Sequence, residues 1–268
     1  WLHFVDSLSN TSAFSQHPLC TTAKGRDVEY LLVGCQKSEP LHRVAITCRH
    51  HCCEMMASYA LEGLIHWVVD GVGTESQWTR DNVQFFIVPF VDKDGVEEGD
   101  QGKGREPRDH GRDYEGESIY ASTAAIRSFL PEWGGDRLRA GIDLHCPHIS
   151  GPHNEVIYVV GSECPCIARE QRCFSEILES AGRGPLPFLA TDFLPFGKAW
   201  NTEKNYLGGK GFSRWLGELP GVVFGAGMEI PYANAGGTEV NQESARCFGE
   251  DLGMALAIYL QQQDGDGR

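Results

Sequence analysis

Two histidines and a glutamate, separated along the sequence, are the residues whose types and spacing best suit chemistry. His51 and Glu54 lie three positions apart in CRHHCCEMM, and His145 ends the distant segment GIDLH. Imidazole and carboxylate groups bind zinc, and a catalytic zinc site takes three protein ligands and leaves a fourth position for water or substrate. A structural zinc site is closed instead, most often by several cysteines. The pattern therefore predicts a catalytic zinc site suited to hydrolysis.

The first ligand has one competitor. His50 immediately precedes His51, and residues three or four apart share one face of a helix, so either imidazole could accompany Glu54. We favour His51. Because H-x-x-E spacing often occurs by chance, the prediction of a metal site depends on His145 as the third ligand.

Further charged residues fit the same chemistry. Glu229 ends the apolar run VVFGAGME, where a carboxylate is unusual because glutamate is rarely buried without a partner. It could be a general base or the partner of an arginine. The segment GKGREPRDHGRDY carries Arg105, Arg108 and Arg112, whose guanidinium groups match a carboxylate in shape and charge. The alternative for this segment is a solvated charged loop.

Composition excludes several classes of function. The chain has 268 residues, of which 41% are hydrophobic, enough for one large α/β core. Its net charge of −14 disfavours nucleic acid as a partner. We find no apolar stretch long enough for a bilayer and no signal-peptide pattern, so we expect no membrane partner. The compartment and the oligomeric state stay open. The 10 cysteines are irregularly spaced, which favours buried free thiols over a disulfide framework.

The order of predicted elements indicates the fold. Apolar runs predict strands over 28–34, 43–48, 83–90, 140–146, 155–160 and 222–230. Helical spacing predicts helices over 52–69, 117–130 and 163–180, and a last helix from an N-cap at Thr238 to about Gln262. We expect the second helix to end at Pro131. This alternation predicts an α/β fold, in which residues 1–268 form a single domain with a central mixed, mostly parallel sheet flanked by helices on both faces.

The candidate residues share one location in that fold. Ligands of open α/β sheets bind beyond the carboxyl ends of the strands. His51, His145, Glu229 and the loop after Asp92 all fall at or just after predicted strand ends. We therefore expect them to form a single site.

At this point the chain resembles the zinc metallocarboxypeptidases of the carboxypeptidase A type, closer to their cytosolic-type and bacterial branch. The resemblance runs from KGRDVEYLLVG through H-x-x-E, the loop PFVDKDG, the arginine-rich segment and the strand-end histidine to Glu229, and covers most of the chain. Each motif is weak alone, but the ordered set is specific. The resemblance implies a peptide substrate and one zinc ion per chain, bound by His51, Glu54 and His145. Glu229 would activate the attacking water and carry its proton to the leaving amine.

The resemblance also implies substrate-binding roles. Arg105 would polarise the scissile carbonyl, with Arg108 as the alternative, and Arg112 would bind the terminal carboxylate. Tyr206 lies where this family has a mobile tyrosine that covers substrate. Arg214 lies in the stretch that lines the family's specificity pocket and would favour an acidic C-terminal side chain, although a helix-surface arginine is the simpler alternative.

One position departs from the family pattern. Gly111 stands where the family has an asparagine just before the carboxylate-binding arginine. One hydrogen bond to the terminal carboxylate would be lost unless His110 or a backbone N–H replaces it. Two other functions therefore stay open beside peptide hydrolysis. One is a zinc amidohydrolase or deacylase acting on N-acyl amino acids or peptidoglycan stem peptides, and the other is a non-catalytic binding relative.

Overall fold

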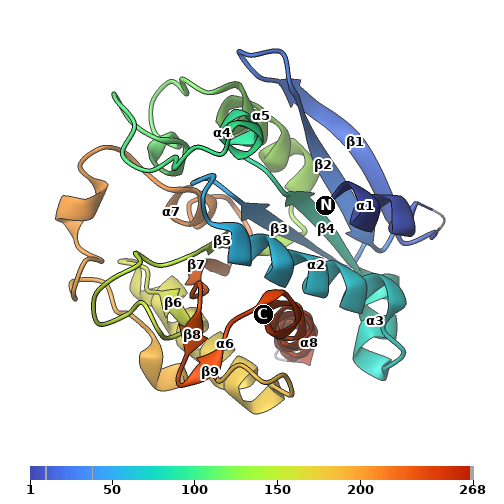
Figure 1. Cartoon of the computed structure of the whole chain (residues 1–268). Helices are drawn as coiled ribbons and strands as arrows, with labels where there is room; N and C mark the ends of the chain where they lie inside the picture. The colour runs from blue at the N-terminus through green and yellow to red at the C-terminus, as the bar shows by residue number, and fades with distance from the viewer. Residues whose placement is uncertain (10, 38, 266–268) are drawn as a thin grey trace.

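The computed structural model describes residues 1–9, 11–37 and 39–265, and its centre is a seven-stranded sheet (Figure 1). The strands of this sheet are β1 (Phe14–Thr21), β2 (Asp27–Gly34), β3 (His42–Cys48), β4 (Val83–Val88), β5 (Leu138–His145), β6 (Tyr158–Val160) and β7 (Phe224–Glu229). Their spatial order is β1-β2-β4-β3-β5-β7-β6. The four central strands β4, β3, β5 and β7 are parallel, whereas β1, β2 and β6 pair antiparallel with their neighbours. This confirms the predicted mixed sheet.

Helices cover both faces of the sheet. The main helices are α1 (Leu2–Leu8), α2 (Met55–Asp70), α3 (Thr74–Asn82), α4 (Lys93–Glu98), α5 (Ala121–Gly134), α6 (Pro165–Ala181), α7 (Phe212–Leu216) and α8 (Gln242–Gly265). Apolar residues of α2, α6 and α8 join one core against the sheet, and those of α5 and α7 join a second core on the opposite face (Figure 1). Within the described ranges, none of the helices is long and apolar enough to cross a membrane.

Two glycines let α2 and α8 pack closely. A Cβ atom at Gly63 would lie 1.9 Å from the carbonyl oxygen of Arg246, and one at Gly249 would lie 1.9 Å from that of Ala60. Both distances are far below van der Waals contact, so only glycine fits at either position. The contact fixes α2 against α8, and α2 begins directly after Glu54.

Several element boundaries differ from the expectation. Helix α5 does not end at Pro131 but continues to Gly134, so the proline lies inside it. Thr238 is not a helix cap: it lies in the short strand β9 (Thr238–Glu239), which pairs with β8 (Asn234–Ala235), and α8 begins four residues later at Gln242. Asn241 and Ser244 instead exchange hydrogen bonds around the start of α8, in which each side chain accepts from the other residue's backbone N–H.

The central strands end at one edge of the sheet, as their parallel pairing requires. The register places Cys48 of β3 beside Leu144 of β5, and His145 of β5 beside Glu229 of β7. The chain segments that follow these strands therefore emerge side by side. This edge holds the candidate site.

Candidate metal centre and substrate cleft

The three residues that the sequence singled out converge at this edge. His51 lies in the turn after β3, Glu54 is the last residue before α2, and His145 is the last residue of β5. One donor atom from each lies within 4.8 Å of the others. His51 Nδ1 is 2.9 Å from Glu54 Oε1, and His145 Nδ1 is 2.8 Å from Glu54 Oε2. Both imidazoles thus turn the same nitrogen toward one carboxylate, an arrangement of donors that suits a tetrahedral cation.

Aspartates occupy the other side of each ring. His145 Nε2 is 2.7 Å from Asp143 Oδ2, and His51 Nε2 is 3.7 Å from Asp109 Oδ2. Metal-binding histidines commonly direct their second nitrogen to a carboxylate, which fixes the ring and the tautomer. The donor set therefore fits a bound zinc ion, with Nδ1 of each ring facing the metal position.

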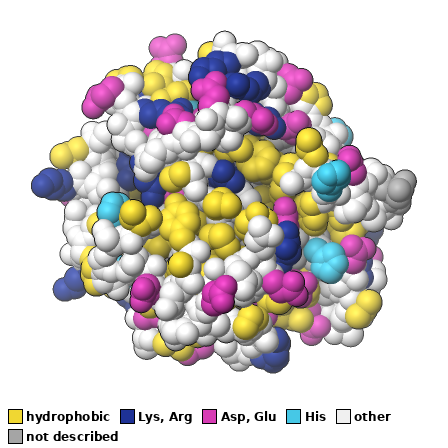
Figure 2. Space-filling model, viewed as in Figure 1, with side chains coloured by type: hydrophobic (Ala, Val, Ile, Leu, Met, Phe, Trp, Pro, Cys, Tyr) yellow, Lys and Arg dark blue, Asp and Glu magenta, His cyan; other side chains and the backbone are white. Residues whose placement is uncertain are grey.

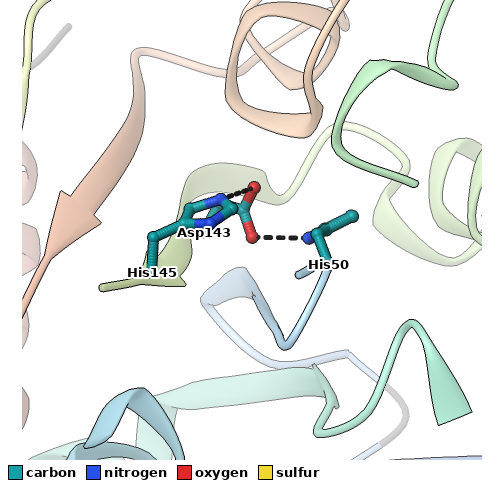
Figure 3. A group of neighbouring side chains, drawn as sticks. All are labelled: His50, Asp143 and His145. Atoms are coloured by element: carbon teal, nitrogen blue, oxygen red, sulfur yellow. Dashed lines mark hydrogen bonds and ion pairs between the residues drawn. The ribbon is translucent and has the colours of Figure 1, made fainter. Parts of the chain in front are cut away.

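A second group of potential ligands overlaps with the first. His50, Asp143 and His145 also bring donor atoms within 4.8 Å of one another (Figure 3). His50 Nδ1 is 2.8 Å from Asp143 Oδ1, and its Nε2 is 2.7 Å from the hydroxyl of Tyr114. Both nitrogens of this fully buried ring are therefore engaged, whereas His51 lines the open cleft. The geometry favours His51 over His50 as the ligand at the cleft.

The charges of the site favour a cation. Burial alone would raise the pKa of Glu54, but the neighbouring His51 and His145 hold it well below its ordinary value. Burial alone would likewise raise the pKa of Asp143, yet His145 and His50 lower it. Both carboxylates are therefore ionised at neutral pH. Burial tends to lower the pKa of His145, but Asp143 and Glu54 raise it well above the usual value, so a bound cation would replace that proton.

Glu229 lies beside this group without a partner of its own. It is the last residue of β7 and is buried, and its Oε2 has no hydrogen-bond partner among the described residues. Burial raises its pKa to about 7, with the nearby Glu54 adding to the shift and His145 opposing it. A carboxylate whose pKa lies near neutrality is suited to accept and return a proton.

The site opens into a cleft of about 640 Å³. Arg112 lines this cleft, and its guanidinium group donates to the carbonyl oxygens of Asn205 at 3.1 Å and Gly111 at 2.8 Å. It also lies over the ring of Tyr206, 5.0 Å from the centroid. Among the described residues its partners are carbonyls and this ring rather than carboxylates, so its charge is available to an anion in the cleft.

The other predicted substrate-binding arginines are paired. Arg105 Nη2 is 2.8 Å from Asp92 Oδ2 and 2.6 Å from Asp100 Oδ2, although the residue lines the cleft. Arg108, also at the cleft, donates to the buried Asp113 at 2.6 Å.

Arg214 lies on α7. Its guanidinium carbon is 4.2 Å from the centroid of the Tyr206 ring, and the group forms an ion pair with Glu163. The Tyr206 ring therefore lies close to both Arg214 and Arg112, and its hydroxyl donates to Asn201 at 2.9 Å. The proposed preference for an acidic C-terminal side chain stays a prediction, since it requires the Arg214–Glu163 pair to open.

The sequence argument missed Lys103, whose Nζ lies 2.7 Å from Glu54 Oε1. No motif marks this lysine. It also missed the aspartates behind the imidazoles, although Asp143 has a sequence signal: it is two residues before His145, so both side chains lie on one face of a strand.

Gly111 has a structural explanation. A Cβ atom there would lie 3.0 Å from His51 Nε2 and 3.3 Å from Asp109 Oδ1. The glycine therefore leaves room for the His51 ring to lie against its aspartate. The departure at this position therefore affects the candidate metal ligand His51 as well as the neighbouring Arg112.

Comparison with known proteins agrees with this architecture. A family model described as zinc carboxypeptidase matches residues 3–155. Among solved structures, the chain is similar to a metallo-carboxypeptidase from Burkholderia cenocepacia, with 21% identity and a TM-score of 0.78, covering 97% of this chain and 68% of that one. A metallo-carboxypeptidase from Pseudomonas aeruginosa, in complex with (2-guanidinoethylmercapto)succinic acid, has 19% identity and a TM-score of 0.74 over 97% and 68%. Carboxypeptidase A from Helicoverpa armigera has 14% identity and a TM-score of 0.66 over 97% and 70%. At these identities the structures establish the fold. A search of curated proteins found no match.

Proposed function

The chain belongs to the zinc carboxypeptidase family, and from this premise we propose that it releases the C-terminal residue of peptides. In this proposal residues 1–268 form one catalytic domain that holds one zinc ion through His51, Glu54 and His145. The supporting observation is the convergence of both Nδ1 atoms on Glu54 in the lining of a cleft that also holds Glu229, whose Oε2 has no hydrogen-bond partner among the described residues.

The proposed roles follow from the contacts. A zinc ion held by His51, Glu54 and His145 would supply a Lewis acid that activates water for attack near neutral pH. Glu229 takes a proton from the attacking water and returns it to the leaving amine, a role that suits its buried carboxylate. Asp109 and Asp143 hold the two imidazoles in orientation.

The substrate would lie along the cleft with its terminal carboxylate on Arg112. A guanidinium group binds a carboxylate through two parallel hydrogen bonds, and Arg112 has no carboxylate partner among the described residues to compete. Tyr206 stacks on Arg112 and would cover the bound C-terminal residue. The family resemblance implies that Arg105 or Arg108 polarises the scissile carbonyl, and Arg214 would set a preference for an acidic side chain.

The experiment that tests this function compares substrates of different classes. Blocked dipeptides ending in Glu, Phe or Lys are incubated with the zinc-loaded protein, beside an N-acetyl amino acid. We expect chelator-sensitive release of the C-terminal residue from dipeptides, fastest with Glu if Arg214 acts as proposed. Preference for the N-acetyl amino acid would favour an amidohydrolase, and zinc binding without turnover of either class would favour a binding relative. A clear preference for Phe would overturn the role of Arg214.

A further inference from the structure

A lysine enters the cleft beside the metal centre. Lys103 Nζ lies 2.7 Å from Glu54 Oε1 and 3.3 Å from the backbone carbonyl oxygen of Cys146, the residue after His145. We propose, on the basis of the proposed function, that Lys103 donates the hydrogen bond that stabilises the oxygen of the scissile carbonyl. Arg105, for which the family resemblance implies this role, would instead be structural.

The ion pairs of Arg105 argue against its binding the oxygen of the scissile carbonyl. Its Nη2 contacts Asp92 at 2.8 Å and Asp100 at 2.6 Å, and Asp92 is 1% exposed. Turning Arg105 toward substrate would leave a buried carboxylate without its cation, which is costly. Two carboxylates also neutralise its charge where it lies. Arg108 is held in the same way by the buried Asp113.

The backbone on both sides of Lys103 is anchored to the metal centre. Gly102 has a φ of +84° and packs so closely that a Cβ there would lie 2.6 Å from the backbone nitrogen of Cys52, the residue after His51. Gly104 has a φ of +64°, and its N–H donates to Asp109 Oδ2 at 2.8 Å. Left-handed backbone at two flanking residues favours glycine and gives the chain a tight turn. Lys103 is therefore presented from a fixed backbone.

The hydrogen bonds of the ammonium leave one donor for substrate. An ammonium group has three N–H donors, and the described contacts use one on Glu54 and one on the carbonyl of Cys146. Lys103 and Glu229 both line the cleft, and Lys103 interacts electrostatically with Glu229 as well as with Glu54. A scissile carbonyl oxygen beside Lys103 would face a positive charge as the water attacks.

The bond changes balance without consuming the lysine. The water oxygen bonds to the carbonyl carbon, one water proton passes to Glu229, and the carbonyl π electrons move to the oxygen that Lys103 faces. The C–N bond then breaks as the oxygen re-forms its double bond, and the amine leaves with the proton from Glu229. Lys103 donates the same hydrogen bond throughout and remains protonated.

The test replaces Lys103 with methionine, which keeps the chain length and removes the charge. Lys24→Met is the matched control, because Lys24 is exposed and pairs with Glu98 at the surface. Arg105→Met tests the competing assignment, and Lys103→Arg tests rescue by another cation. For each variant, kcat and KM on a blocked dipeptide are measured together with zinc content. Calorimetry gives the affinities for a phosphinic dipeptide, which mimics the tetrahedral oxyanion, and for the N-acetyl amino acid product.

For Lys103→Met we expect kcat to fall about 100- to 1,000-fold, the usual cost of losing one oxyanion donor. Zinc content, KM and product affinity should match the wild type, whereas affinity for the phosphinic dipeptide should fall by a similar factor. Lys103→Arg should recover part of the loss, and Arg105→Met should lose less turnover than Lys103→Met.

Three outcomes would overturn this inference and leave the proposed function in place. Loss of zinc from Lys103→Met would make the lysine a support of Glu54 rather than a catalytic residue. A larger loss of kcat in Arg105→Met would return the role to the arginine. If Lys103→Met changes neither turnover nor the affinity for the phosphinic dipeptide, the lysine has no catalytic role, and the proposed function is unaffected. A zinc-loaded wild type that neither cleaves the peptides nor binds the phosphinic dipeptide would instead overturn the proposed function, and the role of Lys103 with it.

Discussion

Glu54 is the residue around which the site is organised. Its two carboxylate oxygens meet one imidazole each, and Lys103 approaches one of the same oxygens. The residue is 1% exposed, so its charge would be costly without these partners. Because Glu54 immediately precedes α2, the helix start fixes where the imidazoles converge.

Glu229 should set the acid limb of the pH profile. Its carboxylate must be ionised to accept a proton, so activity is lost as the pH falls through its pKa. Burial raises this pKa to about 7, and the positive charge of bound zinc would lower it, so we expect the midpoint of the limb at or below about 7. The measurement is kcat/KM as a function of pH, on wild type and Glu229→Gln. Glu229→Gln should lose nearly all turnover and retain zinc, and activity that rises with falling pH would contradict the role.

Arg112 should govern affinity for the terminal carboxylate. Its guanidinium group is held by the carbonyl oxygens of Asn205 and Gly111 and stacked on Tyr206, so it is in place before substrate arrives. A hydrogen bond to a charged group contributes about 1.5–3 kcal/mol, so Arg112→Met should raise KM roughly 10- to 100-fold. Steady-state kinetics on a dipeptide and on its C-terminal amide test this. If Arg112→Met raises KM for the C-terminal amide as much as KM for the dipeptide with a free carboxylate, the arginine does not recognise the carboxylate.

Among the elements of the fold, the parallel central strands could be predicted from the sequence, whereas the edge strand β1 and the start of α8 could not. The runs that became β3, β4, β5 and β7 are almost wholly buried, so the pattern identified them. Strand β2 was also identified, although only about half of its residues are buried. Strand β1 is an edge strand that contains Pro18 and is only partly buried, which removes the apolar signal. The predicted start of α8 at Thr238 was wrong because Thr238 pairs with Ala235 in a small hairpin, a contact that propensity does not reveal.

The residues of the candidate site also divide into those that the sequence predicted and those that it did not. His51, Glu54, His145 and Glu229 were found because strand ends in a parallel sheet share an edge, and the structure brings them together there. Lys103 could not be found in this way. Its position depends on the flanking turn and on contacts of Gly102 and Gly104 with distant residues, not on any regular element.

The stability of the protein should depend on the glycines at the contact between α2 and α8. Gly249→Ala would push a methyl group to 1.9 Å from the carbonyl oxygen of Ala60, so the helices must separate. Such overpacking typically costs about 1–3 kcal/mol of unfolding free energy. Chemical denaturation should show the loss, and Gly208→Ala, where no heavy atom lies within 4 Å of the added Cβ, should show far less. Equal stability of the two variants would mean that the helices are not held this closely.

For the whole molecule, the charges of the cleft differ little from those of the surface. The net charge is −14, and acidic and basic side chains are interspersed over the face seen in Figure 2. The cleft likewise combines basic residues (Lys103, Arg105, Arg108 and Arg112) with acidic ones (Glu54, Glu106, Asp109, Asp143 and Glu229). Of these basic residues, Arg112 has no carboxylate partner among the described residues, so it is the position where the cleft can attract the carboxylate of a substrate.

The whole fold is needed to complete the site. Residues 3–155, which match the family model, contain the three proposed zinc ligands and Arg112, whereas Glu229 and Tyr206 lie outside that stretch. The pairing of β7 with β5 brings Glu229 beside His145. The proposed catalytic arrangement therefore depends on the assembled sheet rather than on one continuous segment.

The most direct test of the central claim is zinc content measured together with peptide hydrolysis, on wild type and on His145→Ala. We expect about one zinc ion per wild-type chain, released by chelator together with the activity, because the three proposed ligands match a catalytic zinc site. His145→Ala should lose both zinc and turnover while α2 and the sheet remain folded by circular dichroism. A wild type that binds no zinc after the metal is added back, or a His145→Ala variant that keeps both zinc and turnover, would contradict the claim that these residues form the catalytic centre.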